Sequence, residues 1–161
     1  MPKPDHEKTK LARSITSSPW FKPVVFVLAT LAIVFLPLIF YKPPTNTLVL
    51  DGQAYTLEIV VSAEERKKGL SGRESLAANE GMLFVEAKPN IACFWMKDMN
   101  FAIDILWLDD KKVIRHLEER LSPKTYPKSF CPPVKTKYVV ELPSGSIDKY
   151  QLAVGQKLPL N

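Results

Sequence analysis

The stretch IACFWMKDMNFAIDILWLD, residues 91–109, decides how this chain folds, because it concentrates strand-forming and aromatic residues. Its large apolar side chains are those of Cys93, Phe94, Trp95, Met96, Met99, Phe101 and Trp107. Three charged residues stand among them: Lys97, Asp98 and Asp104. Burying a charge is costly unless it is paired, so these three side chains either face water or form a site.

Turn and cap residues divide the rest of the chain into short elements. Asp51-Gly52 supplies the positive φ angles of a type I′ turn and predicts a β-hairpin. Ser62 and Glu65 form a capping-box pattern, which predicts a short helix that ends at Gly69. We expect strands at residues 47–50, 53–61, 82–85, 91–96, 103–108, 112–118, 137–142 and 152–158, and further helical segments at residues 71–76 and 144–150.

The region at residues 120–136 contains four prolines and predicts a loop across the sheet surface, because proline cannot donate a hydrogen bond within a central strand. Short strands dominate the remaining pattern, and helices are few. The sequence therefore predicts a mostly β (α+β) domain over residues 47–161. We expect a small antiparallel barrel-like β domain with one or two short helices.

An uncharged apolar segment at residues 23–41 precedes this domain and predicts one transmembrane helix. Nineteen helical residues extend about 28 Å, close to the hydrocarbon thickness of a bilayer. A cleaved signal peptide is the competing interpretation. However, the apolar run is longer than a usual h-region, and no clear small-x-small cleavage site follows it. We therefore favour an uncleaved signal-anchor, with the lipid bilayer as a partner of residues 23–41.

The flanking charges predict the orientation of this helix. The polar tail at residues 1–22 contains five Lys or Arg residues, whereas the linker at residues 42–46 contains one, Lys42. The positive-inside rule places the tail in the cytoplasm and the β domain outside it, in a single-pass protein of the cell membrane. The net charge of +5 belongs largely to the tail, and no basic, aromatic-interleaved stripe indicates nucleic-acid binding.

Three separated motifs resemble a known family. They are GLSGRESLAANEGMLF at residues 69–84, FWMKDMNFAIDILWLD at residues 94–109 and KYVVELPSGSIDKYQLAVGQKL at residues 137–158. In this order they are similar to the bacterial and archaeal family named Domain of Unknown Function 192, over nearly all of residues 47–160. The resemblance implies a compact β-rich domain, often exported, to which no biochemical activity is assigned.

The motifs also show where this chain follows the family pattern and where it departs from it. The matching residues are Arg73, Gly81, Lys97 and Asp104. The family pattern usually has Asn at the position of Asp98 and often has Pro at the position of Ala102. The first departure places a negative charge beside Lys97, where the family pattern has a neutral amide.

Cys93 and Cys131 are the two cysteines of the chain, and both follow the predicted membrane helix, where no reducing buffer is expected. They predict a disulfide, which chain-entropy estimates value at about 3 to 4 kcal/mol. The alternative is two buried free thiols. A copper(I) site is a third hypothesis, with the ligands Cys93, Met96, Met99, His116 and Cys131. Methionines among aromatic residues usually fill core gaps, however, so we expect neither a metal nor a cofactor.

Lys97 and Asp104 flank a bend and, with Asp98, are the expected polar site. In the functional interpretation these residues line a mouth of the barrel that binds a small ligand or a peptide terminus, between Trp95 and Trp107. In the structural interpretation, Lys97 and Asp104 form an ion pair that closes the bend, supported by Arg73. The predicted ligand-binding residues are Arg73, Trp95, Lys97, Asp98 and Asp104.

Catalytic residues are not indicated by the sequence. His116 is the one histidine after the membrane segment, and it lies within a predicted strand without an evident nucleophile. The sequence therefore favours a membrane-anchored extracytoplasmic binding or interaction module, whose partner is a small ligand or an envelope protein, over an enzyme. The alternatives are a hydrolase or transferase that uses Lys97 and Asp104, and a copper-handling protein.

Overall fold

A computed structural model describes residues 26–27 and 44–160 of this 161-residue chain. The predicted tail at residues 1–22 lies outside the described residues. The predicted transmembrane helix also lies outside them, apart from Phe26 and Val27, which are helical. None of the helices in the described ranges is long and apolar enough to cross a membrane. The chain divides into two units, residues 1–42 and 43–161, and the second is described below.

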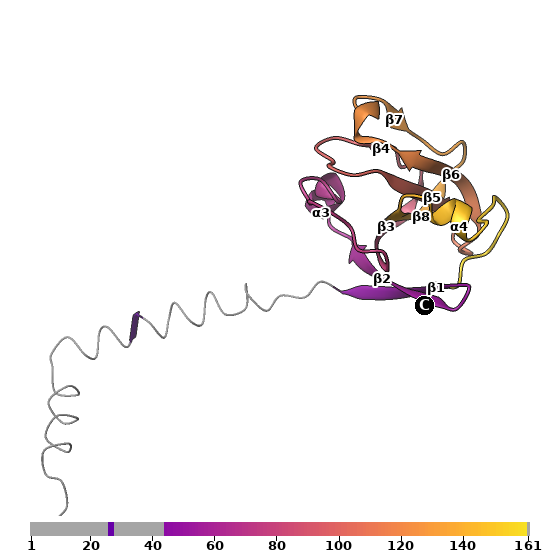
Figure 1. The fold of residues 1–161 in the computed structure, drawn as a ribbon, viewed down its shortest axis with the longest axis horizontal. Coiled ribbons are helices and arrows are strands. Elements are labelled where there is room, and N and C mark those ends of the chain that lie inside the picture. The colour runs from indigo at the N-terminus through magenta and orange to yellow at the C-terminus, as the bar shows by residue number, and fades with distance from the viewer. Residues whose placement is uncertain (1–25, 28–43, 161) are drawn as a thin grey trace, which may run out of the picture. The chain divides into compact units, whose positions relative to one another are not determined.

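Short strands make up most of the second unit, and two short α-helices and a 3₁₀ helix interrupt them (Figure 1). In chain order the elements are β1 (Thr45–Leu50), β2 (Gln53–Val60), α3 (Ala63–Lys68), β3 (Glu80–Asn90), β4 (Phe94–Trp95), β5 (Ile103–Leu108), β6 (Ile114–Leu121), the 3₁₀ helix η1 (Pro123–Thr125), β7 (Ser129–Phe130), β8 (Thr136–Pro143) and α4 (Ser146–Lys149). The predicted mostly β fold with two short α-helices is confirmed.

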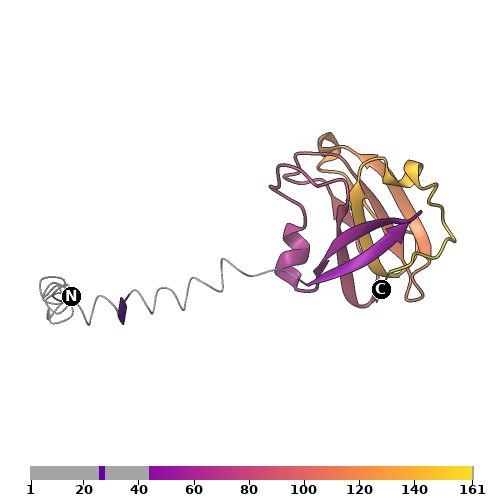
Figure 2. The same ribbon diagram turned by 60° about the horizontal axis from the view of Figure 1, so that its bottom comes forward.

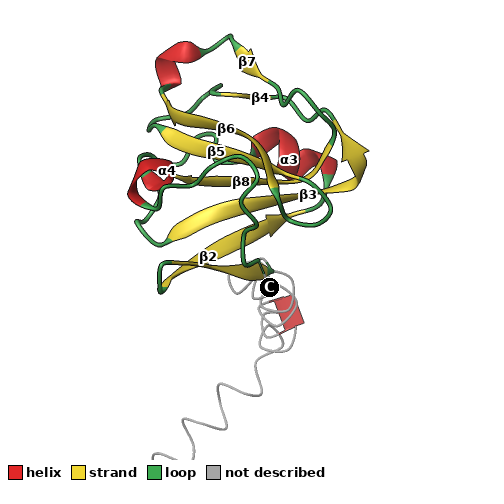
Figure 3. Ribbon diagram, turned by 90° about the vertical axis from the view of Figure 1, so that its right-hand side faces the viewer, coloured by secondary structure: helices red, strands yellow, loops and turns green. Residues whose placement is uncertain are grey.

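Six of these strands form one sheet in the order β1-β2-β3-β8-β5-β6, and β4 and β7 form a separate pair (Figure 3). Neighbouring strands are antiparallel except β2 and β3, which run parallel. The parallel pair is possible because α3 and the turns after it carry the chain back to the start of β2.

The six-stranded sheet is open, so the predicted barrel-like architecture is wrong. The expected last strand at residues 152–158 does not form, and isolated bridges take its place, from Leu160 to Leu48 of β1 and from Lys157 to Val113 beside β6. Gly155 has a φ of 94°, which interrupts the extended backbone that a continuous ladder needs. The C-terminal segment therefore touches both outer strands without pairing along either of them.

Apolar side chains cover both faces of the sheet. The α4 face carries Leu57, Leu83, Leu106, Val140 and Leu142, which pack with Ile147 of α4 and with Leu158 of the C-terminal segment. The α3 face carries Met82, Phe84, Ile105, Trp107 and Val139, which pack with Leu70 after α3 and with Phe130 of β7. Figures 1 and 2 show α3 and α4 on opposite sides of the strands. Alternate residues of β3, β5 and β8 thus enter two different cores.

Residues near the N-terminus of the domain form the turn and the helix cap that the sequence predicts. Asp51 and Gly52 have φ angles of 47° and 76° in the turn between β1 and β2. The Ser62 side chain accepts a hydrogen bond from the Glu65 backbone N–H, and the Glu65 carboxylate accepts one from the Ser62 N–H, so the capping box is confirmed. Residues 71–76, by contrast, form turns and not the expected helical segment.

The segments around the two cysteines differ most from expectation. The predicted strand at residues 91–96 is reduced to β4, which pairs with β7 through Phe94 opposite Phe130 and Trp95 opposite Ser129. The proline-rich region at residues 120–136 therefore contains β7, the end of β6 and the first residue of β8 as well as the predicted loop. The Cys93–Cys131 disulfide joins the two segments beside this pair and confirms the predicted bridge.

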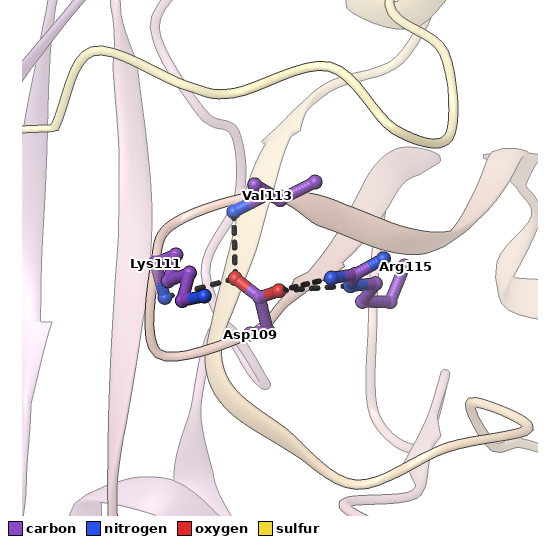
Figure 4. A network of polar contacts seen from close by, with 4 residues as sticks. All are labelled: Asp109, Lys111, Val113 and Arg115. Atoms are coloured by element: carbon purple, nitrogen blue, oxygen red, sulfur yellow. Dashed lines mark hydrogen bonds and ion pairs between the residues drawn. The ribbon is translucent and has the colours of Figure 1, made fainter.

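Asp109 organises the turn between β5 and β6 (Figure 4). Its Oδ1 accepts hydrogen bonds from the backbone N–H groups of Lys111 and Val113, both at 2.9 Å. Its Oδ2 accepts hydrogen bonds from Arg115 Nε and Nη2 at 2.8 and 2.6 Å. Partial burial raises the pKa of Asp109, but these hydrogen bonds outweigh it and hold the pKa below its usual value. Asp109 is thus the centre of the turn that joins β5 to β6.

Gly81 allows β2, β3 and β8 to approach one another closely. A Cβ at this position would lie 2.6 Å from the Glu141 carbonyl oxygen and 2.7 Å from Leu57 Cδ2. We expect Gly81→Ala to lower the free energy of unfolding by about 1 to 3 kcal/mol, because backbone on one side cannot move away. Urea unfolding measures the loss. Ala87→Gly, at an exposed position of the same strand, should cost no more than about 1 kcal/mol; equal effects would contradict the packing argument.

Candidate functional site

Asp104 is buried inside the domain and does not line the ligand-accessible opening that the sequence predicts. Its side chain is fully buried on β5, opposite Leu142 of β8. The carboxylate accepts hydrogen bonds from three backbone N–H groups, of Arg120 at 2.8 Å, Gly145 at 3.1 Å and Ile147 at 2.8 Å. These bonds tie β5 to the end of β6 and to the start of α4. Asp104 therefore points to the α4 face of the sheet.

Lys97 and Asp98 lie in the turn after β4, against residues 71–73. The Ser71 hydroxyl donates to the Lys97 carbonyl, and the Gly72 N–H donates to the Asp98 carbonyl, each at 2.8 Å. Asp98 has a φ of 55°, in the left-handed region where Asn and Asp are the best tolerated residues after glycine. The backbone at this position thus explains why the family pattern accepts a neutral amide or, here, a carboxylate.

A cavity of about 150 Å³ lies on the α3 side of the domain; we call it the Glu141 cavity. Residues 66–71, at the end of α3 and after it, form one wall. The remaining lining residues are Phe84, Cys93, Phe94, Trp95, Met99 and Glu141. Edge-to-face contacts place Phe94 between Phe84 and Trp107, with ring centroids 4.8 and 5.9 Å apart. The Trp107 Nε1–H donates to the Ala92 carbonyl at 2.8 Å and holds this segment over the sheet.

Glu141 is the unusual residue of this cavity. It lies on β8 with only 6% of its surface exposed, on the same face as Val139. Its Oε2 has no hydrogen-bond partner among the described residues. Burial raises the pKa of Glu141 to about 8, although the nearby Arg73 guanidinium lowers it. At neutral pH the side chain is therefore mainly a neutral carboxylic acid, able to donate one hydrogen bond.

Arg73 reaches the edge of this region from the turn after α3. Its Nη2 forms an ion pair with Glu58 Oε2 at 2.7 Å. Glu58 on β2 is in register with Met82 on β3, which is in register with Glu141 on β8. The ion pair thus lies along the same row of side chains as the buried acid, and Arg73 supplies the positive charge that acts on it.

A second hollow of about 350 Å³, which we call the Trp95 hollow, adjoins the Glu141 cavity. The two share Lys67, Lys68, Ser71 and Trp95 as lining residues. Glu64, Lys97 and Asp98 complete the Trp95 hollow. The Trp95 side chain is 48% exposed, so its ring is a wall that a ligand can reach from solvent.

The structure thus brings together three of the five residues that the sequence predicts as a site: Trp95, Lys97 and Asp98. Arg73 does not line the Trp95 hollow and forms an ion pair with Glu58. Asp104 faces the other side of the sheet. The alternative ion pair between Lys97 and Asp104 is not among the ion pairs of the described residues. Both thiolates that the copper hypothesis needs are consumed by the disulfide.

The sequence reasoning missed Glu141, Lys67 and Lys68. A signal for Glu141 was present, because a single carboxylate interrupts the apolar run around Val140 in a predicted strand. Lys67 and Lys68 have only a local explanation in the sequence, because basic residues in the last turn of a helix complement its dipole. No sequence pattern places that helix end beside β4, because the contact joins segments that are distant in the chain.

Similarity to known proteins identifies the family of this chain. A family model for DUF192, described as Uncharacterized ACR, matches residues 46–160. This chain belongs to the DUF192 family. The resemblance that the three sequence motifs carry is therefore confirmed, and the DUF192 domain covers all the strands and helices of the second unit except Thr45, the first residue of β1. No curated protein matches the chain.

Solved structures share the DUF192 domain's fold. A proposed transcription regulator from Sinorhizobium meliloti is 23% identical with a TM-score of 0.68, over 74% of this chain and 96% of the other. A protein of unknown function from Novosphingobium aromaticivorans is 22% identical with a TM-score of 0.63, over 71% of this chain and 82% of the other. At these identities the likeness shows the fold alone.

Asp104→Asn tests whether the buried carboxylate supports the fold. The amide keeps one acceptor oxygen but presents an NH₂ to backbone N–H donors, so we expect the free energy of unfolding to fall by about 2 to 4 kcal/mol. Urea unfolding measures it. Asp110→Asn, at an exposed position six residues later, is the matched control and should have little effect. Similar midpoints for both variants would contradict the structural role.

Glu141→Gln tests the buried acid through the pH dependence of stability. The pKa is raised to about 8 from an ordinary value of 4.5, so the unfolded chain ionises first as pH rises. The contribution of Glu141 is present below pH 4.5 and is lost as pH rises through 8. Between pH 5 and 7, the free energy of unfolding of the wild type should fall, relative to Glu141→Gln, by up to about 1.4 kcal/mol per pH unit. Parallel curves for the two proteins would contradict the raised pKa.

Proposed function

We propose that this domain is a binding module for a small molecule that enters the Glu141 cavity. The single observation that carries the proposal is the carboxyl of Glu141, which is buried, lines the cavity and leaves Oε2 without a hydrogen-bond partner. An unpaired buried polar atom costs free energy, roughly 1 to 3 kcal/mol. A ligand that supplies the missing partner recovers that cost, which makes the position suited to binding.

The chemistry of the walls indicates what kind of molecule fits. Phe94 and Trp95 offer flat apolar surfaces, and Met99 offers an adaptable one. The neutral carboxylic acid of Glu141 can donate a hydrogen bond to a carbonyl oxygen, an ether oxygen or an aromatic nitrogen of the ligand. Lys67 and Lys68 stand where the cavity meets the Trp95 hollow and favour a negative group there. The proposed ligand is a small planar or apolar molecule with an acceptor at its inner end and an anionic group at its outer end.

Lys97 and Asp98 take part as residues of the Trp95 hollow. Lys97 adds a third positive charge for the anionic group, and Asp98 holds the turn that presents it, through the bond from the Gly72 N–H. Arg73 does not contact the proposed ligand; its positive charge lowers the pKa of Glu141. Asp104 has no part in this site because backbone amides occupy its carboxylate.

A binding module is favoured over a hydrolase or transferase by the same arrangement. Those reactions were assigned to Lys97 and Asp104, which lie on different sides of the sheet. The cavity itself presents one acid and no hydroxyl nucleophile beside a base, since Ser71 donates its hydroxyl to the Lys97 carbonyl.

We also propose that the domain works at a membrane surface. The support is the apolar segment at residues 23–41, with the basic tail at residues 1–22 before it. A single-pass anchor with this orientation would present the cavity outside the cytoplasm, to ligands or proteins of the cell envelope.

A ligand-detected NMR screen of small aromatic carboxylates against the purified full-length chain tests the binding proposal. We expect several to bind and to quench tryptophan fluorescence, with affinity reduced at least about tenfold in Trp95→Ala and in Glu141→Met, which has no hydrogen-bond donor. Tyr126→Ala removes another exposed aromatic ring, 46% exposed against 48% for Trp95, and should leave binding unchanged. Binding that survives both cavity variants, or no binding by any compound, would overturn the proposal.

A further inference from the structure

The Cys93–Cys131 disulfide has surroundings that a purely structural bridge does not need. Both cysteines are exposed, in contrast to the buried residues beside them, Phe130 and Pro132. Cys93 borders the Glu141 cavity, whereas Cys131 is not among the residues that line it. Cys93 and the buried acid Glu141 thus line one cavity, and solvent can reach both cysteines.

We propose that this disulfide is redox-active and exchanges with external thiols, with Glu141 as the proton donor to the Cys93 sulfur. The proposal rests on the Glu141 cavity and goes beyond ligand binding, because it does not require a ligand in the cavity. The co-reactants are low-molecular-weight or protein thiols in the reducing direction, and disulfides in the oxidising direction.

The charges around the cavity support the exchange. Arg66, Lys67 and Lys68, at the basic end of α3, line the same cavity as Cys93. Their positive charge attracts the negatively charged substrate thiolate toward the bridge. Arg66 is held in this place by hydrogen bonds from Nη1 to the Val61 and Val85 carbonyls.

Each step of the exchange balances. A substrate thiolate attacks Cys131 Sγ, a new S–S bond forms, and the Cys93–Cys131 bond breaks with its electron pair on Cys93 Sγ. Glu141 transfers its proton to that sulfur and becomes a carboxylate. A second substrate thiol then gives its proton to Glu141, and the resulting thiolate attacks the substrate sulfur of the mixed disulfide. Cys131 leaves as a thiolate and takes up a proton from water, so two thiols become one disulfide and the protein is left with two thiols.

The fold is built so that this bridge can open without loss of the sheet. Neither cysteine belongs to the six-stranded sheet, and β4 and β7 contain two residues each. Phe94 contacts the rings of Phe84 and Trp107, and Phe130 is buried, so both neighbours of the cysteines have packing contacts besides the bridge. We expect these contacts to hold the two cysteines near each other for reoxidation.

Burial and the Arg73 guanidinium, which is paired with Glu58, set the pH at which Glu141 donates a proton. Arg66, Lys67 and Lys68 are the other charged residues that line its cavity. Met82 on β3 and Ile105 on β5, which are in register with Glu141, carry no charge. Since the pKa of Glu141 is raised to about 8, the acid keeps its proton across the neutral range.

The test is the rate at which dithiothreitol reduces the bridge in the oxidised full-length chain, followed between pH 6 and 9 by alkylation of free thiols and mass spectrometry. We expect reduction in the folded state, with the NMR signals of the six-stranded sheet retained and reoxidation by oxidised glutathione. Per unit of reductant thiolate, the rate should fall as pH rises through about 8 in the wild type. In Glu141→Gln it should be about tenfold lower at pH 7 and independent of pH, whereas Glu119→Gln, an exposed control, should match the wild type.

Two results would overturn the proposal. One is a bridge that resists dithiothreitol until the domain unfolds, which is the behaviour of a structural staple. The other is equal reduction rates for the wild type and Glu141→Gln at every pH. The double variant Cys93→Ser with Cys131→Ser separates this activity from ligand binding. If it still binds the aromatic carboxylates while no exchange occurs in the wild type, the redox proposal fails and the binding proposal stands.

Discussion

Strand β8 is the constraint on which the rest of the domain depends. It pairs with β3 on one side and with β5 on the other, and the sheet around it is covered on both faces. Its residues must therefore be apolar on both sides, as Val139 and Val140 are. Glu141 is the exception: it is a carboxyl on a strand whose two faces are both buried. Burial disfavours the charged form, so the side chain stays protonated.

Two of the buried carboxyls of the sheet, those of Asp104 and Glu141, have different surroundings and different roles. Asp104 and Glu141 lie on neighbouring strands and face opposite sides of the sheet. Asp104 receives three backbone N–H donors and thereby joins β5, β6 and α4. Glu141 receives no such donor from the described residues, and it lines a cavity together with Cys93, Lys67 and Lys68. A satisfied buried carboxylate stabilises a fold, whereas an unsatisfied one beside a cavity is available for chemistry.

The structure gives a different physical reason for each residue at the positions compared with the family pattern. Gly81 is required by the approach of the Glu141 carbonyl oxygen, and Asp104 by the backbone amides that it receives. Asp98, where the pattern has Asn, occupies a left-handed backbone conformation that either residue tolerates. Lys97 and Asp98 both line the Trp95 hollow, so these two positions belong to the proposed site, whereas Gly81 and Asp104 do not.

The sequence by itself determined what depends on neighbouring residues: the Asp51-Gly52 hairpin, the capping box of Ser62 and the β5 strand with its exact ends. It also identified the family and the disulfide. Only the tertiary structure decided that the sheet stays open, that β2 and β3 run parallel and that Lys97 and Asp104 lie apart. The reason is physical: turns and caps act over about four residues, whereas burial depends on which distant strands pair. Residues 91–109, which looked like a single polar site, are therefore divided by the sheet, and the buried acid of the cavity comes from β8.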